Sequence, residues 1–177
     1  MKNKDQNLRP ETNRGCNIWV NVAEPDYCGF IFNVSGSRRS IGAEQLNILV
    51  DMLNPEIVPI GVFVNEKTDV ILRIVRESGI RMVQLHGQEN GEIIHTIQSK
   101  AQVPVIKAVS VRSKEDVRSA VLSPADYLLF DCGEGGTGQT FLTGICLRIF
   151  RGRIFGGRRD RDAQYGRSPS TFFTVCA

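Results

Sequence analysis

Short apolar runs alternate with helical patterns through the middle of the chain, and this alternation constrains the fold more than any other feature. The runs are rich in β-branched and aromatic residues and lie at 27–32, 57–64, 81–85, 103–109 and 127–130. Apolar runs of this length are typical of strands that are buried on both faces of a sheet. They recur roughly every 22–25 residues, which is the spacing expected of repeated βα units.

Amphipathic patterns fill the intervals between the runs and predict helices at 43–53, 67–78, 92–100 and 113–121. In the second of these, the apolar residues recur at helical spacing, and Gly79 is predicted to end the helix. Ser113 is predicted to cap the last helix, where Glu115 and Asp116 lie in the first turn. Strands that alternate with helices predict an α/β fold with a parallel sheet, but periodicity leaves both an open sheet and a closed barrel possible.

Polar residues follow several of the predicted strands. Asn65, His86 and Asp131 directly follow a predicted strand, and Lys107 stands two residues before a strand end. In both parallel architectures the carboxyl ends of the strands form the edge at which ligands bind. Gln84 lies two residues before His86, so the two side chains are expected on the same face of their strand.

The two ends of the chain lack this order. Residues 1–22 are polar without a period, and residues 142–177 combine Arg, Gly and Asp. Phe172, Phe173 and Val175 are not expected to form a strand. We therefore expect an aberrant or disordered segment at 1–22, a core domain at 23–141 and an aberrant basic tail at 142–177. The tail has no alternation of aromatic and basic residues, and nucleic acid is not expected as a partner.

Composition adds a few limits on class and compartment. The five cysteines show no CxxC spacing and no signal peptide precedes them, which predicts free thiols in the cytoplasm. No apolar run approaches the length of a membrane span. No metal site is predicted.

Several strings of the middle region resemble phosphoribosylanthranilate isomerase. They are DYCGFIF from Asp26, SRRSI from Ser37, GVFVN from Gly61, VQLHGQE from Val83, VIKAVSV from Val105, and LLFD from Leu128 followed by GGTGQTF from Gly135. The VQLHG and GGTGxTF strings, in this order and at strand ends, are the most specific. The likeness covers about residues 23–141 and implies a TIM barrel of (β/α)₈ type. A complete barrel takes about 250 residues, so the barrel is expected to be incomplete, with about five intact parallel units.

The resemblance implies the Amadori rearrangement of N-(5-phosphoribosyl)anthranilate in tryptophan biosynthesis, without a metal or organic cofactor. Such a reaction needs an acid for the ring oxygen and a base for the C2 proton. In the family, a Cys in a KICG-like string and an Asp directly after the GGTGxTF string fill these roles. This chain has no KICG-like string, and Leu142 follows Phe141. No catalytic residue is therefore assigned, and the chain is expected to be impaired or inactive.

Five residues are predicted to bind the phosphorylated sugar-anthranilate substrate. Arg39 matches the arginine that the family places beside the substrate, while Gln84 and His86 are expected to line the mouth of the barrel. Lys107 is either a solvated strand end or a charge beside the anionic substrate. Asp131 either caps a loop amide or contacts the substrate.

The departures at both ends are consistent with shifts of the reading frame. With suitable codons, Asn3 to Pro10 read one base later gives Ile-Lys-Ile-Lys-Ile-Cys-Gly-Leu. In the same way, Phe141 to Cys146 read two bases beyond the Phe codon gives Asp-Trp-Asp-Met. Two other interpretations stay open. One is an active isomerase that recruits Cys28 or Asp131, and the other is a non-catalytic remnant or binding protein that uses its basic tail. Loss of barrel strands also predicts aggregation or association with chaperones.

Overall fold

The computed structural model describes residues 20–34, 37, 39–131 and 173–176. Residues 20–23 are helical, and Val20 is buried in the core. The strands that follow are β1 (Tyr27–Phe32), β2 (Ser40–Ile41), β3 (Val58–Phe63), β4 (Met82–Leu85), β5 (Val105–Ser110), β6 (Tyr127–Asp131) and β7 (Phe173–Cys176). The helices are α2 (Ala43–Asp51), α3 (Thr68–Ser78), α4 (Gly91–Ala101) and α5 (Lys114–Val121). The predicted strands and helices of the middle region are thus confirmed, with small shifts at their ends.

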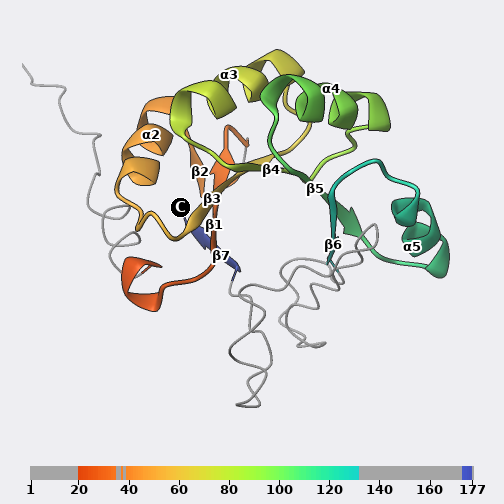
Figure 1. Ribbon diagram of the computed structural model, residues 1–177. Helices are drawn as coiled ribbons and strands as arrows, with labels where there is room; N and C mark the ends of the chain where they lie inside the picture. Colours follow the sequence, from red (N-terminus) through yellow and green to blue (C-terminus); the bar gives the residue numbers. More distant parts are fainter. Residues whose placement is uncertain (1–19, 35–36, 38, 132–172, 177) are drawn as a thin grey trace, which may run out of the picture.

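All paired strands run parallel. The order along the sheet is β2-β1-β3-β4-β5-β6, and β7 pairs with β1. Each strand from β3 to β6 lies next to the strand that precedes it by one βα unit, which is the arrangement of a barrel wall rather than of a doubly wound sheet. Figure 1 shows the sheet curving around a centre, with α2, α3, α4 and α5 on its outer side.

Local signals in the sequence fix where the helices begin and end. Gly79 follows α3 with a φ of 68°, a left-handed conformation that glycine adopts without steric cost. The Ser113 side chain accepts a hydrogen bond from the Asp116 amide, and the two residues form a reciprocal capping box. Both predicted boundaries are confirmed.

The two faces of the sheet bury different groups of side chains. The larger core lies between the strands and helices α2, α3 and α4, and its fully buried members include Phe30, Leu46, Phe63, Ile71 and Ile97. A smaller cluster contains strand residues only: Tyr27, Ile60 and Met82, with Val58, Ile106 and Tyr127 packed against them. Because side chains alternate along a strand, this second cluster marks the inner face of the curved sheet.

Two strands were not anticipated from the sequence. The prediction of no strand is wrong for Phe173 and Val175, since Phe173–Cys176 pairs in parallel with Tyr27–Phe30, and Phe172 lies outside the described residues. A four-residue run that is separated from its partner by most of the chain carries little local signal. The two residues of β2 are also too few for a period, and they pair with Ile31 and Phe32 at the other end of β1. Together, β2 and β7 therefore cover the edge of β1 that faces away from β3.

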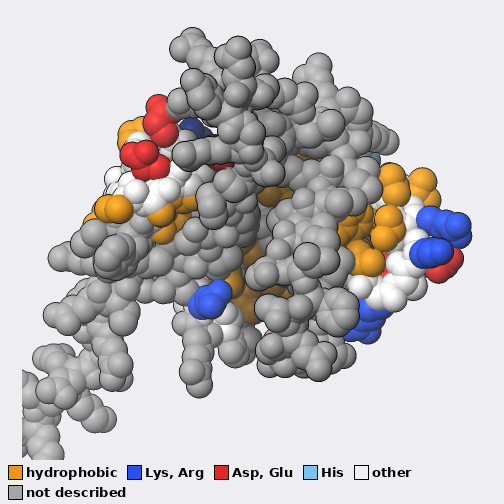
Figure 2. All heavy atoms as spheres, turned by 90° about the horizontal axis from the view of Figure 1, so that it is seen from below, with side chains coloured by type: hydrophobic (Ala, Val, Ile, Leu, Met, Phe, Trp, Pro, Cys, Tyr) orange, Lys and Arg blue, Asp and Glu red, His pale blue; other side chains and the backbone are white. Residues whose placement is uncertain are grey.

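The opposite edge and the outer surface carry exposed apolar groups. Within the described part of the chain, β6 pairs with β5 alone. Val121 and Leu122, at the end of α5, are 48% and 84% exposed. Hydrophobic side chains next to Lys and Arg gather on this side of the molecule (Figure 2). None of the described helices combines the length and apolar character that crossing a membrane would need.

Candidate functional site at the carboxyl ends of the strands

The parallel sheet brings the carboxyl ends of its strands to one edge, and four of the five predicted binding residues lie there. Arg39 is exposed in the connection between β1 and β2, and its amide donates to Ser37 Oγ at 3.3 Å. His86 is the exposed residue that directly follows β4. Asp131 ends β6, and its backbone lies opposite Ser110. Gln84 lies near the end of β4, two residues before His86. The fifth residue, Lys107, starts further back in β5 and reaches forward to the same edge.

Gln84 has the least satisfied environment of these residues. It is 3% exposed and pairs in register with Val62 and Ile106, on the inner face of the sheet. Among the residues that the structure describes, its buried Oε1 atom has no hydrogen-bond partner. A buried acceptor without a donor costs about 1–3 kcal/mol, so such atoms are rare in folded proteins.

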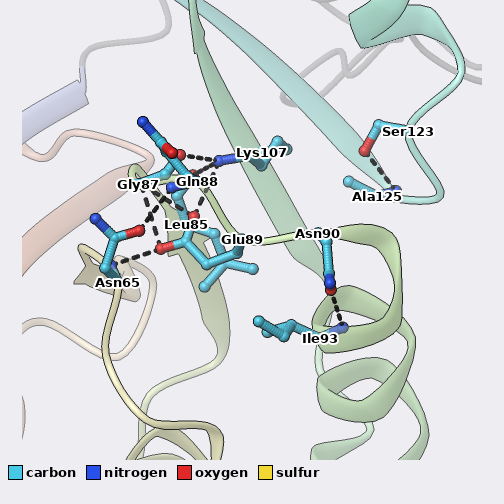
Figure 3. Close-up of polar contacts among 10 residues, drawn as sticks. All are labelled: Asn65, Leu85, Gly87, Gln88, Glu89, Asn90, Ile93, Lys107, Ser123 and Ala125. Carbon is cyan, nitrogen blue, oxygen red and sulfur yellow. Dashed lines mark hydrogen bonds and ion pairs between the residues drawn. The ribbon is translucent and has the colours of Figure 1, made fainter.

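Lys107 and Glu89 form a buried ion pair on the helix-facing side of the sheet. Lys107 Nζ lies 2.9 Å from Glu89 Oε2, with the side chains 12% and 2% exposed. The same ammonium donates to Gly87 O at 2.6 Å and to Leu85 O at 3.4 Å. Figure 3 shows Lys107 reaching from β5 to the segment that follows β4. In the structure, the Lys107 ammonium therefore binds two backbone carbonyl groups and one carboxylate of the chain itself.

The Glu89 carboxylate also binds backbone amides. Its Oε1 accepts from the amide of Asn65 at 2.8 Å, and its Oε2 accepts from the amide of Gly87 at 3.0 Å. Burial on its own would raise the pKa of the Glu89 carboxyl. The hydrogen bond from Lys107 and those from the amides outweigh burial and hold the pKa below its ordinary value of 4.5. Glu89 is therefore ionised, and both of its carboxylate oxygens accept hydrogen bonds.

Asn65 joins the loop after β3 to the loop after β4. It has a φ of 50°, in the left-handed region that asparagine tolerates better than most residues. Its Oδ1 accepts a hydrogen bond from the amide of Gln88 at 2.7 Å. A Cβ atom on Gly87 would lie 2.3 Å from this same oxygen and 2.7 Å from the backbone nitrogen of Asn65. Only glycine fits at position 87 while Asn65 holds its place.

We expect Gly87→Ala to destabilise the fold by about 1–3 kcal/mol, because the added methyl group overlaps Asn65 and must displace one of the two loops. Urea unfolding followed by circular dichroism measures the change. Gly42→Ala is the matched control, since a Cβ there has nothing within 4 Å. Equal stability of the two variants would contradict the close contact between Gly87 and Asn65.

Glu89 is the functional residue that the sequence prediction missed. It stands four residues after the last residue of β4, where a lone carboxylate ordinarily belongs to a solvated loop. The available signal was the basic residue Lys107 inside the next apolar run, since a charge within a buried strand requires a partner. The glycine-rich string at Gly135 to Phe141 and the position of Leu142 lie outside the described residues.

Curved parallel sheets with helices outside and polar groups at the carboxyl edge define the class of β/α-barrel proteins with a small-molecule site. The family model of N-(5'-phosphoribosyl)anthranilate (PRA) isomerase matches residues 13–145. This chain belongs to that family.

Individual relatives agree with this assignment. The chain is 35% identical over 136 residues to N-(5'-phosphoribosyl)anthranilate isomerase of Lachnoclostridium phytofermentans, covering 75% of this chain and 62% of the relative. It is 37% identical over 149 residues to the enzyme of Endomicrobium trichonymphae, covering 81% of this chain and 72% of that relative. A crystal structure of the isomerase from Thermotoga maritima matches with a TM-score of 0.62 at 32% identity, covering 68% of this chain and 60% of that one. The chain thus spans about 62% of the length of the first of these relatives.

Proposed function

We propose that this chain derives from a phosphoribosylanthranilate isomerase of tryptophan biosynthesis, and that its sheet edge binds the substrate or product of that reaction while turning it over poorly. The buried Gln84 Oε1 on the inner face, which has no partner within the described part of the chain, is the observation that carries the proposal. An acceptor left without a donor in the free protein is satisfied when a ligand brings an O–H or N–H group to it. A related isomerase structure holds reduced 1-(o-carboxyphenylamino)-1-deoxyribulose 5-phosphate, which carries such donors.

We further propose that Gln84, His86, Arg39 and Asp131 bind this ligand. The arginine offers a charge for the phosphate or carboxylate, and the histidine can donate or accept a proton. Neither a general acid nor a general base is assigned among the residues that the structure describes. Lys107 is not included among these ligand contacts, since its ammonium already has protein partners.

Organisation and compartment remain part of the same proposal. We take residues 23–141 as the isomerase-derived domain, residues 1–22 as an aberrant or disordered segment and 142–177 as an aberrant basic tail. The buried, free Cys28 is compatible with a reducing cytoplasm. The exposed Leu122 and the β6 edge support a tendency to aggregate or to engage chaperones.

The direct test is a fluorescence assay that follows loss of phosphoribosylanthranilate, run beside a full-length relative. We expect turnover at least about 10²-fold below that of the relative, since loss of one general acid or base commonly costs 10²–10⁴-fold. Calorimetric titration with reduced 1-(o-carboxyphenylamino)-1-deoxyribulose 5-phosphate should still detect binding. Robust turnover would refute the impaired activity, and absence of any binding would refute the retained site.

Gln84→Leu separates binding from stability. Leucine has nearly the same size but no acceptor, so the variant should be more stable by about 1 kcal/mol while losing affinity for the ligand. Gln98→Leu is the control, because Gln98 Nε2 donates to Pro124 O and to Asp126 Oδ2 at 3.0 and 2.9 Å. That variant should lose stability and keep its affinity. Unchanged affinity in Gln84→Leu would remove Gln84 from the site.

A further inference from the structure

The backbone around His86 is held from three sides. The amide of His86 donates to Phe63 O at 2.8 Å, which ties the residue to β3. The carbonyl groups on either side of it, Leu85 O and Gly87 O, both accept from Lys107 Nζ, at 3.4 and 2.6 Å. Lys107 comes from β5, where it lies opposite Leu85 in the register. A single ammonium therefore brackets the residue that directly follows β4.

Lys107 has no donor left for a substrate in this arrangement. An ammonium group carries three N–H donors, and Leu85 O, Gly87 O and Glu89 Oε2 take all three. Its charge is balanced by the Glu89 carboxylate at 2.9 Å. A substrate phosphate or carboxylate would have to displace one of these partners from a site that is mostly shielded from water.

Glu89 also links this set of contacts to the residues that follow β3. Its carboxylate accepts from the amide of Asn65, which follows β3, and from the amide of Gly87, which follows β4. The Asn65 side chain accepts in turn from the amide of Gln88. The segments that follow β3 and β4 are thus joined to the interior of β5 by one connected set of hydrogen bonds, which we name the Glu89 cluster (Asn65, Gly87, Gln88, Glu89 and Lys107; Figure 3).

We propose that Glu89 and Lys107 are positioning residues that hold His86 at the mouth of the site, and that neither touches the ligand. The proposal rests on the proposed function only in taking His86 as a ligand contact. It replaces the expectation of a substrate contact at Lys107 with a role exerted through the backbone on both sides of His86. Groups that act through a neighbour in this way set its orientation and so influence affinity from a distance.

Nuclear magnetic resonance of the imidazole groups tests the positioning directly, because His86 and His95 are the only histidines of the chain. His95 lies exposed on α4 and serves as an internal reference. We expect Glu89→Gln to shift and broaden the His86 signals, with the His95 signals unchanged. Glu115→Gln is the matched control, since it removes an ion pair at 3.1 Å whose side chains are 72% and 77% exposed, and neither histidine should respond.

A second variant and a second readout keep the test decisive. Glu89→Asp retains the charge with a shorter reach and should give a smaller His86 shift than Glu89→Gln. In the unmodified protein, the amides of Gly87 and Gln88, which donate to Glu89 and to Asn65 Oδ1, should exchange with deuterium more slowly than the same two amides in Glu89→Gln. Unshifted His86 signals in Glu89→Gln, equal shifts of both histidines, or fast exchange at Gly87 would each overturn the proposal.

Ligand titration then separates this inference from the proposed function. Glu89→Gln should bind reduced 1-(o-carboxyphenylamino)-1-deoxyribulose 5-phosphate about tenfold more weakly, as coupling of roughly this size is common between connected groups. If the unmodified chain binds no ligand while the His86 signals respond as expected, the proposed function fails and the positioning stands. If the unmodified chain binds and Glu89→Gln binds equally well with unshifted signals, the positioning fails alone.

Discussion

Phe63→Ala should lower the free energy of unfolding by about 3–5 kcal/mol, as loss of a fully buried aromatic side chain removes its transfer free energy and leaves a cavity. Phe63 is 0% exposed in the larger core, and its ring lies 5.6 Å from that of Phe32, centroid to centroid. A Cβ on Gly61 would lie 2.7 Å from the Phe63 ring, so the surrounding space is already filled. Urea unfolding followed by circular dichroism measures the loss.

Two controls define what the Phe63 result means. Phe63→Leu keeps most of the volume and should cost clearly less than Phe63→Ala. Ile48→Ala removes a side chain that is 52% exposed on α2 and should change stability by no more than about 0.5–1 kcal/mol. A loss in Phe63→Ala no larger than that in Ile48→Ala would mean that β3 does not pack against the helices as described.

Lys107→Ala should be comparably severe, at about 3–5 kcal/mol near neutral pH, because it leaves the Glu89 carboxylate buried without its partner. The double variant, in which Lys107→Ala is combined with Glu89→Gln, should lose less than the sum of the two single variants, since no unpaired charge then remains. Chemical denaturation of the two single variants and the double variant gives the coupling energy. A purely additive result would show that the two groups do not interact.

The pH dependence of this pair has a definite sign. The pKa of Glu89 is lowered in the folded protein, mainly by Lys107 and by backbone amides acting against burial. Such a group contributes stability above its ordinary pKa of 4.5, and that contribution is lost as pH falls through the folded value. The difference in stability between the unmodified chain and Lys107→Ala should therefore shrink on acidification below about pH 4.5. A difference that grows on acidification would contradict the ion pair.

Sequence reasoning captured the fold where local signals were strong. The strands at Tyr27–Phe32 and Val58–Phe63 are short apolar runs, and α3 ends at the glycine that its pattern indicated. β7 was missed because its pairing with β1 depends on contacts between distant parts of the chain, which no local period records. Propensity over a four-residue window is a weak guide when tertiary pairing decides the structure.

The position of the candidate site could be predicted from the sequence, but the ion pair between Lys107 and Glu89 could not. Parallel strands share a carboxyl edge, and the resemblance of the VQLHG string to the family led to the prediction that Gln84 and His86 lie there. The partnership of Lys107 with Glu89 could not be read in the same way, because a loop carboxylate and a strand lysine are each compatible with solvent. Only the folded chain determines that both are buried, and burial is what makes their pairing obligatory.

The Glu89 cluster means that the loops after β3 and β4 are not independent of each other or of strand β5. A substitution selected in one of the two loops to accommodate a different molecule also shifts the anchor points of the other. Engineering of new specificity on this scaffold should therefore treat the two loops and Lys107 as one unit, and should leave Gly87 and Asn65 fixed while the surrounding positions are varied.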